Sequence, residues 1–314
     1  MSGISKTDVH VDTALTNLSV QYKPELSGLI AEQAVRVLNV AKESDKYFIW
    51  DRPTAFRVPT DLRADGAEAN EVDHALTTAS YACDEYALKT HVTDRQKDNA
   101  DSILKLRENK MRHVQNLELI AQEQRVATLL TTQGNYASGN YTTLSGVGQW
   151  NNASFSGSIE ETIDTYKEAI RQKIGMYPNT VIIPAAVAQV VKRDASIREL
   201  IKYTQSDLLV NGDLPPTMWN MKVLIPKGIS TTSMIGASSV VMGDIWGKDV
   251  ILTYVPPEGS IDTPAHAYIL RAKNFMVRSW REESRNTEWI EVSVIQDEVV
   301  TSNISGALIQ DVIA

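Results

Sequence analysis

From Ala67 to Gln133 the chain contains neither glycine nor proline. Such a stretch can hold one long element, because nothing in it breaks a helix or forces a turn. Thr93 followed by Gln96 is the pattern of a capping box, which marks a helix start. We therefore predict a helix over residues 94–132, which would be about 50 Å long at 1.5 Å per residue. That length favours a helix that crosses a flat domain.

The predicted helix carries an apolar stripe that should face a sheet, with charged residues largely opposite. The stripe comprises Ile103, Leu106, Val114, Leu117 and Ala121, and the polar face comprises Lys105, Glu108, Arg112 and Glu123. The stripe is not a sustained heptad, so a coiled coil is the weaker interpretation. We expect Leu117→Asp to place a charge in the core and to prevent folding.

Two segments without much core of their own precede this helix. Residues 1–45 read as an extended arm with short helical pieces, the clearest over residues 26–38. Residues 46–93 read as a long hairpin whose end, residues 61–74, is charged and built from small side chains. A two-stranded ribbon is marginal alone in water. We therefore expect the arm and the hairpin to pack on other copies of the chain.

The charged residues of the hairpin are the candidate site for contact between subunits. They are Arg57, Asp61, Arg63, Asp65, Glu68, Glu71 and Asp73. One interpretation is a solubilising loop. The other, which we favour, is an electrostatic contact with a neighbouring subunit, because such a contact would stabilise an otherwise marginal ribbon.

A mixed body of helices and strands follows the long helix. Ser158 begins a helix that Gly175 ends, and residues 180–183 read as a buried strand. The longest strand candidates, residues 268–277 and 289–300, lie near the end of the chain. The order of elements predicts an α+β fold.

Composition excludes several classes of protein. The chain has 314 residues and a net charge of −8, which disfavours nucleic-acid binding by bulk attraction. No apolar run is long enough for a membrane span, and no secretory signal is visible. One cysteine, Cys83, excludes an intrachain disulfide and a zinc site built on several thiolates. Its acidic neighbours should raise the pKa of its thiol.

Motifs for catalysis are missing from the sequence. It contains no phosphate-binding loop, no G-x-S-x-G nucleophile elbow and no H-E-x-x-H zinc motif. The five histidines read as surface or structural residues. We therefore expect no catalytic residues, no metal, no cofactor and no enzymatic activity. A hydrolase whose site is scattered along the sequence is the alternative from a different class.

Five local strings, taken in order, resemble HK97-type major capsid proteins of tailed bacteriophages. The strings are DVHVDTALTNLSVQY at 8–22, SDKYFIW at 44–50, R-x-D-G-x-E-A at 63–69, YACDEYALKTHVTDRQKDNAD at 81–101 and MYPNTVIIPAAVAQVVKRD at 176–194. The resemblance implies an HK97-like capsid fold with an N-terminal arm, an extended hairpin loop, a long spine helix, and peripheral and axial domains.

The same resemblance implies domain boundaries. They are an N-terminal arm over 1–45, the extended hairpin over 46–93, the spine helix and first part of the peripheral domain over 94–178, the axial domain over 179–262, and closing strands of the peripheral domain with a return to the axial domain over 263–314.

As a capsid protein the chain would assemble into pentamers and hexamers that form an icosahedral shell around double-stranded DNA, without sequence-specific binding. It would be located in the virion capsid after assembly in the host cytoplasm, with no membrane contact. Expected partners are a portal, possible decoration or cement proteins, and a separate scaffold protein. The alternative to a separate scaffold is an N-terminal scaffold segment that has been cleaved, and the initiating Met1, directly before the arm, favours the separate protein. Residues 47–88 contain no lysine, so covalent joining of subunits through a hairpin lysine is not expected.

Two rival interpretations lie close to this one. The first is an encapsulin-type shell that holds a cargo enzyme. The second is another structural part of a phage, such as a tail or decoration protein, although such proteins seldom need so long a helix.

Overall fold

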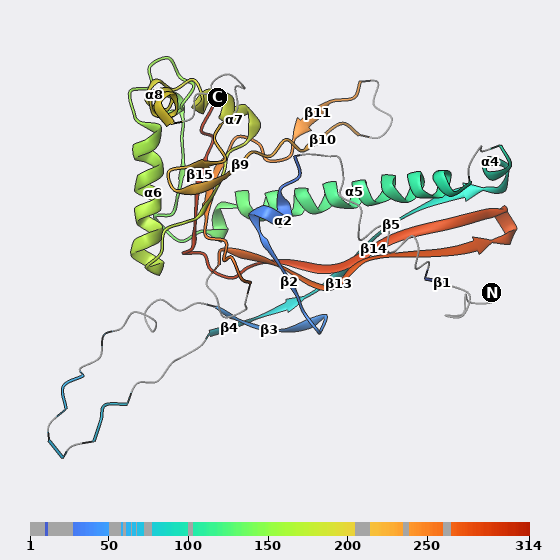
Figure 1. Cartoon of the computed structure of the whole chain (residues 1–314), viewed down its shortest axis with the longest axis horizontal. Coiled ribbons are helices and arrows are strands. Elements are labelled where there is room, and N and C mark those ends of the chain that lie inside the picture. The colour runs from blue at the N-terminus through green and yellow to red at the C-terminus, as the bar shows by residue number, and fades with distance from the viewer. Residues whose placement is uncertain are drawn as a thin grey trace.

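The computed structural model describes residues 10–11, 28–49, 58, 61–63, 65–66, 68–71, 77–99, 103–204, 214–234, 239–259 and 265–314. Two sheets lie at an angle to each other, and one long helix runs from one to the other (Figure 1). Helices and strands are mixed along the chain, which confirms the predicted α+β class. The predicted domain boundaries stay a prediction.

The first sheet is a long, narrow platform of five strands. Its strands are β1 (His10–Val11), β2 (Arg36–Asn39), β5 (Asp84–Thr93), β13 (Ala267–Glu282) and β14 (Thr287–Val300). Strands β13 and β14 form its antiparallel centre and are joined by the short helix η3 (Glu283–Arg285). Strand β5 pairs antiparallel with β14 at one edge, while β1 and β2 both pair with β13. The long strands predicted near the end of the chain are therefore present.

The long helix packs along one face of this sheet. Thr93 caps the short helix α4 (Asp94–Asp98) with the predicted capping box, and α5 (Ile103–Thr131) follows. Met111 and Val114 of α5 are buried against apolar residues of β5, β13 and β14. Since residues 100–102 lie outside the described residues, the predicted single helix is described as these two pieces.

The predicted orientation of this helix is wrong at two positions. Leu117, placed in the buried stripe, is 43% exposed, whereas Glu123, placed on the polar face, is 1% exposed. Gln115, Glu118 and Gln122 are also buried. The face that packs on the body therefore includes polar side chains, which hydropathy alone assigns to solvent.

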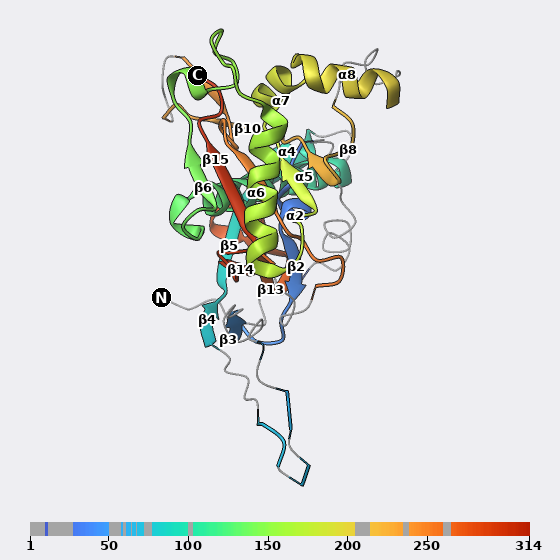
Figure 2. The same cartoon turned by 90° about the vertical axis from the view of Figure 1, so that its left-hand side faces the viewer.

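The second sheet has six strands in the order β6-β15-β12-β7-β9-β8. They are β6 (Tyr141–Thr143), β7 (Thr180–Ile182), β8 (Thr217–Met218), β9 (Met221–Leu224), β12 (Val250–Thr253) and β15 (Gly306–Gln310). All residues of β7 and β12 are buried, so these central strands are covered on both faces. Helices α6 (Ile159–Ile174), α7 (Ala185–Val191) and α8 (Ala195–Thr204) lie on this part of the molecule, with α6 across the sheet (Figure 2). Short helices η1 (Gln133–Asn135) and η2 (Gly146–Gly148) flank β6.

Helix α6 begins and ends as its sequence predicts. The Ser158 hydroxyl accepts a hydrogen bond from the backbone N–H of Glu161 at 3.2 Å, which caps the helix start. Gly175 closes the helix at φ 74°, a left-handed conformation that glycine adopts without strain. Ile163, Ile170 and Ile174 face the core, so the helical spacing of these isoleucines fixes which side of α6 covers the sheet.

The segment before the projecting ribbon differs from the predicted helical piece over residues 26–38. Among the described residues of this piece, 28–38, α2 (Ala31–Ala34) is the helical part, and the chain then enters β2, which runs parallel to β13. Pairing with a long strand of the body outweighs the local helical spacing. Because Ile30, Ala34 and Val35 are buried in the chain's own core, the expectation that the first 93 residues lack a core is wrong here.

Two hairpins project from the body. The charged ribbon consists of β3 (Ser44–Ile49) and β4 (Thr77–Ala82), paired antiparallel, together with the tip beyond them. The second consists of β10 (Ile229–Thr231) and β11 (Met242–Asp244) and extends beside α5 (Figure 1). Neither two-stranded sheet pairs with a further described strand.

Candidate functional site

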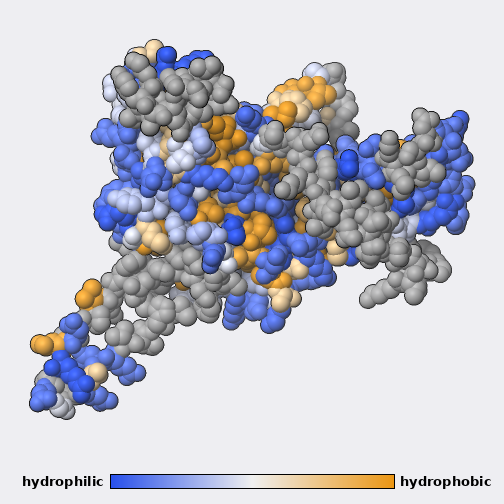
Figure 3. Space-filling model, viewed as in Figure 1, coloured by the Kyte–Doolittle hydropathy of each residue, from blue (hydrophilic) through white to orange (hydrophobic). Residues whose placement is uncertain are grey.

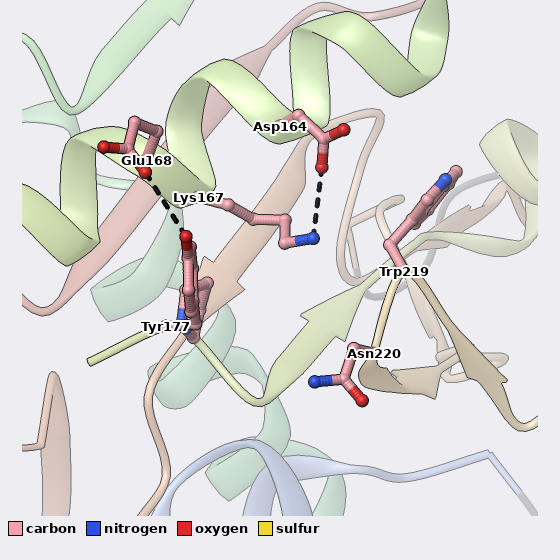
Figure 4. A pocket seen from close by; sticks show the side chains of 7 residues that line it. Asp164, Lys167, Glu168, Tyr177, Trp219 and Asn220 are labelled. Atoms are coloured by element: carbon pink, nitrogen blue, oxygen red, sulfur yellow. Dashed lines mark hydrogen bonds and ion pairs between the residues drawn. The ribbon is translucent and has the colours of Figure 1, made fainter.

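One hollow of about 390 Å³ lies between α6 and the turn that joins β8 to β9. In Figure 4, Lys167 lies between Tyr177 and Trp219 and pairs with Asp164 at 3.1 Å. The neighbouring Glu168 is hydrogen-bonded to the Arg171 guanidinium, which lowers the pKa of the Glu168 carboxyl to about 2. Both lining carboxylates are thus engaged with cations. The hollow has the character of a surface held by ion pairs and not of an acid–base centre.

Candidate reactive side chains outside this hollow, among the described residues, include Cys83 and His266. Within the described ranges, no three His, Cys, Asp or Glu side chains lie together as metal ligands. Burial, followed by the negative charge of Asp297, raises the pKa of the Cys83 thiol, so the expected direction is right although burial is the larger cause. His266 is fully buried and lies stacked on Tyr136 with ring centroids 4.6 Å apart. Among the helices that the structure describes, none is long and apolar enough to cross a membrane.

The predicted contact residues lie where the charged ribbon reaches furthest from the body. Asp61, Arg63, Asp65, Glu68 and Glu71 are all exposed, at the far end of the projecting segment (Figures 1 and 2). Arg57 and Asp73 lie outside the described residues. The apolar side chains of Val58 and Leu62 are 92% and 83% exposed at the same tip. The tip is therefore available to a second molecule, and its contact role stays a prediction.

The base of the charged ribbon, in contrast, is held by the chain itself. Tyr47 of β3 and Tyr81 of β4 are buried in a cluster with Tyr268 and Leu270 of β13. The Tyr47 hydroxyl donates to the backbone carbonyl of Val300 at 3.3 Å. This anchoring fixes the direction in which the ribbon leaves the body.

A second exposed projection, the β10–β11 hairpin, was missed by the sequence reasoning. Its exposed apolar side chains are Ile229 (50%), Met234 (89%), Val240 (71%), Val241 (55%) and Met242 (52%). In Figure 3 it appears as an orange projection above the body. The absence of charge was a signal that the sequence did offer, because no charged residue lies between Lys227 and Asp244. We call the described residues of this hairpin, 229–234 and 239–244, the apolar hairpin.

Glu123 ties the start of α2 and the root of the apolar hairpin to the long helix, a role that the sequence also did not reveal. Its carboxylate accepts hydrogen bonds from the backbone N–H groups of Ile30 and Ala31, the latter at 2.7 Å, and from Trp246 Nε1 at 2.6 Å. Burial raises the pKa of this carboxyl, although the three donors favour its charged form. We call this arrangement the Glu123 clasp. It joins α5 to the start of α2 and to the segment after β11.

The chain is similar to capsid proteins along nearly its whole length. It is 29% identical over 299 residues to the major capsid protein of Burkholderia phage BcepMu, covering 92% of each chain. It is 26% identical over 204 residues to the major capsid protein of Pseudomonas phage JBD67, covering 65% of this chain and 63% of that protein. No protein-family model matches the chain.

Solved structures agree with these relatives. A phage-related protein from Bordetella bronchiseptica has a TM-score of 0.74 at 21% identity, covering 97% of this chain and 98% of that one. The SrpI encapsulin of Synechococcus elongatus has a TM-score of 0.57 at 12% identity, covering 99% and 92%. The predicted HK97-like capsid fold is confirmed by this likeness.

Proposed function

We propose that this chain, which has the HK97-type fold and resembles the major capsid proteins of tailed bacteriophages, is itself a major capsid protein. Its copies would assemble into pentamers and hexamers that tile an icosahedral shell around double-stranded DNA. The observation that carries the proposal is the sequence match to the BcepMu capsid protein over 92% of both chains. The role is structural and assigns no reaction to the chain.

The shape of the chain supports assembly. The charged ribbon leaves the body from an anchored base, and its described tip residues are exposed on all sides. A monomer gains nothing from such a projection, because a ribbon without a covering surface is marginal. A neighbouring copy would supply that surface, and the charged residues of the tip would set the register of contact.

The charge of the chain suits a container for DNA. A net charge of −8 disfavours tight binding to phosphates, so the shell would enclose DNA without reading its sequence. Since residues 47–88 contain no lysine, non-covalent contacts or a decoration protein would stabilise the shell. A separate scaffold protein and a portal complete the proposed partners, and the proposed location is the virion capsid after assembly in the host cytoplasm.

The alternative is an encapsulin-type shell that holds a cargo enzyme. The likeness to the SrpI encapsulin, at 12% identity, carries the fold alone. The phage relatives are similar in sequence as well. We therefore favour DNA as the content.

The content of particles purified from cells that express the full set of phage genes distinguishes the capsid function from the encapsulin function. We expect megadalton particles on sedimentation, with nuclease-protected double-stranded DNA inside. Particles that contain a host enzyme and no nucleic acid would favour the encapsulin alternative. A small, compact oligomer would contradict both shell functions and favour a soluble enzyme.

A further inference from the structure

The apolar hairpin projects from the body without the residues that usually protect an exposed sheet edge. Exposed sheet edges in soluble proteins are usually protected by charged side chains or proline, which discourage pairing with other chains. Here residues 229–243 contain neither a charged residue nor a proline. Both Val240 and Val241 are more than half exposed near the end of the hairpin. A surface of this kind is a liability unless a partner covers it.

The root of the hairpin is held in a fixed direction. The backbone N–H of Ile245 donates to the Gly228 carbonyl at 3.1 Å, and that of Lys227 donates to the Gly28 carbonyl at 3.0 Å. A Cβ atom at Gly228 would lie 3.2 Å from Cδ2 of Leu29 and 3.3 Å from Cδ1 of Ile245. Glycine therefore lets the hairpin root pack closely against Leu29. Because the root is rigid, the hairpin loses little conformational entropy when it binds. This favours a partner that lies in a defined position.

The chemistry of the hairpin selects a protein as its partner. It carries no lysine or arginine between Lys227 and Asp244, so phosphates of nucleic acid or anionic lipid have nothing to pair with. The chain itself offers a partly apolar counterpart. A hollow of about 510 Å³ along α5 is lined by Ala121 and Leu129 together with polar side chains, among them Thr128 and the ion pair of Arg125 with Glu298. If the hairpin of one copy entered the hollow of another, the contact would be head-to-tail, the type that can close rings.

We propose that the apolar hairpin packs against a second copy of this chain and is a principal contact between neighbouring subunits. The inference rests on the proposed shell function, because every subunit of a shell has other copies of the chain beside it. This inference goes beyond the contact predicted for the charged tip, since it assigns a contact to a second hairpin, which is apolar. Burial of the apolar hairpin would contribute most of the binding free energy, and the charged tip would fix how neighbouring subunits are aligned.

The double variant Met234→Asp with Val240→Asp tests the proposal. Both side chains are exposed, at 89% and 71%, so the substitutions should leave the fold and its circular dichroism spectrum intact. Buried against a neighbour, the two carboxylates should reduce particle yield about tenfold or more. The matched control is Val147→Asp, 68% exposed on η2, which should assemble like the parent chain. Equal particle yields for the double variant and the parent would overturn the proposal.

A photo-crosslinking residue at position 240 gives a second, independent measurement on assembled particles. Crosslinked bands at twice the chain's mass would support a second copy as the partner. Crosslinks to a different protein alone, or none between chains, would overturn it. If the parent chain forms no particles at all, the shell function itself fails. If the parent assembles and the double variant assembles equally well, only the inference about the hairpin fails.

Discussion

Trp246 Nε1 donates a hydrogen bond to Glu123 Oε1 across 2.6 Å, joining the middle of α5 to the segment that follows the apolar hairpin. The same carboxylate receives the backbone N–H groups of Ile30 and Ala31. One buried side chain therefore holds the long helix, the start of α2 and the root of the apolar hairpin together. These three segments are far apart in sequence.

Replacing Glu123 by glutamine should weaken this junction. The glutamine amide has one oxygen and one NH₂ group in place of two carboxylate oxygens. At least one of the buried N–H donors that now bond to Glu123 would therefore lose its acceptor. We expect the free energy of unfolding to fall by about 1–3 kcal/mol in chemical denaturation. The control is Glu199→Gln at an exposed position on α8, which should change it by less than about 0.5 kcal/mol. Equal stability of the Glu123 variant and the parent would show that the hydrogen bonds contribute nothing net.

The corrected orientation of α5 reverses the expectation for Leu117. Since Leu117 is 43% exposed, Leu117→Asp should fold and remain soluble. Val114, three residues earlier and 3% exposed, packs against the sheet, so Val114→Asp should prevent folding by burying a charge. Soluble yield and circular dichroism of the two variants measure this. A folded Val114 variant beside an unfolded Leu117 variant would contradict the packing described here.

His266 should make the folded body sensitive to mild acid. Its Nδ1 donates to the Ser302 carbonyl at 2.9 Å, while Nε2 is buried without a partner among the described residues. Burial lowers the pKa of His266 to about 4. Because the unfolded chain takes up the proton near pH 6.5, stability is full above that pH and is lost as pH falls towards 4.

Between pH 7 and pH 5 this histidine should cost about 2 kcal/mol of the free energy of unfolding. Denaturation at both pH values measures the difference. His266→Gln should remove most of it, whatever its effect on absolute stability. His113→Gln, at an exposed position on α5, should retain it. An unchanged pH dependence in the His266 variant would assign the effect to another group.

Deleting residues 61–74 should separate folding from assembly. The base of the ribbon is anchored by Tyr47 and Tyr81, so the body should keep its spectrum and its melting temperature as an unassembled protein. Particle yield and the heat stability of any particles should fall severalfold, because the contact residues at the tip are gone. Particles with unchanged yield and heat resistance would leave the tip as a solubilising loop.

The sequence predicted those parts of the fold that depend on local signals. The capping box at Thr93, the end of α6 at Gly175 and the buried strand at residues 180–182 follow from short patterns. What the sequence could not predict depends on contacts across the chain. The burial of Glu123 needs donors from Ile30 and Trp246, which no local window contains.

The candidate site divides in the same way. Charge pattern alone pointed to the tip residues, and the structure places the described ones in the open, but their contact role awaits experiment. The apolar hairpin was overlooked because uncharged runs of this length also occur in buried strands. Only the exposure of Met234 and Val240 distinguishes the two cases.

Negative-stain electron microscopy of the purified chain at high concentration tests self-assembly most directly. We expect closed shells of icosahedral outline, with rings of five and six subunits in class averages. A field of dispersed monomers or small oligomers under those conditions, from protein shown to be folded, would contradict a capsid role for this chain.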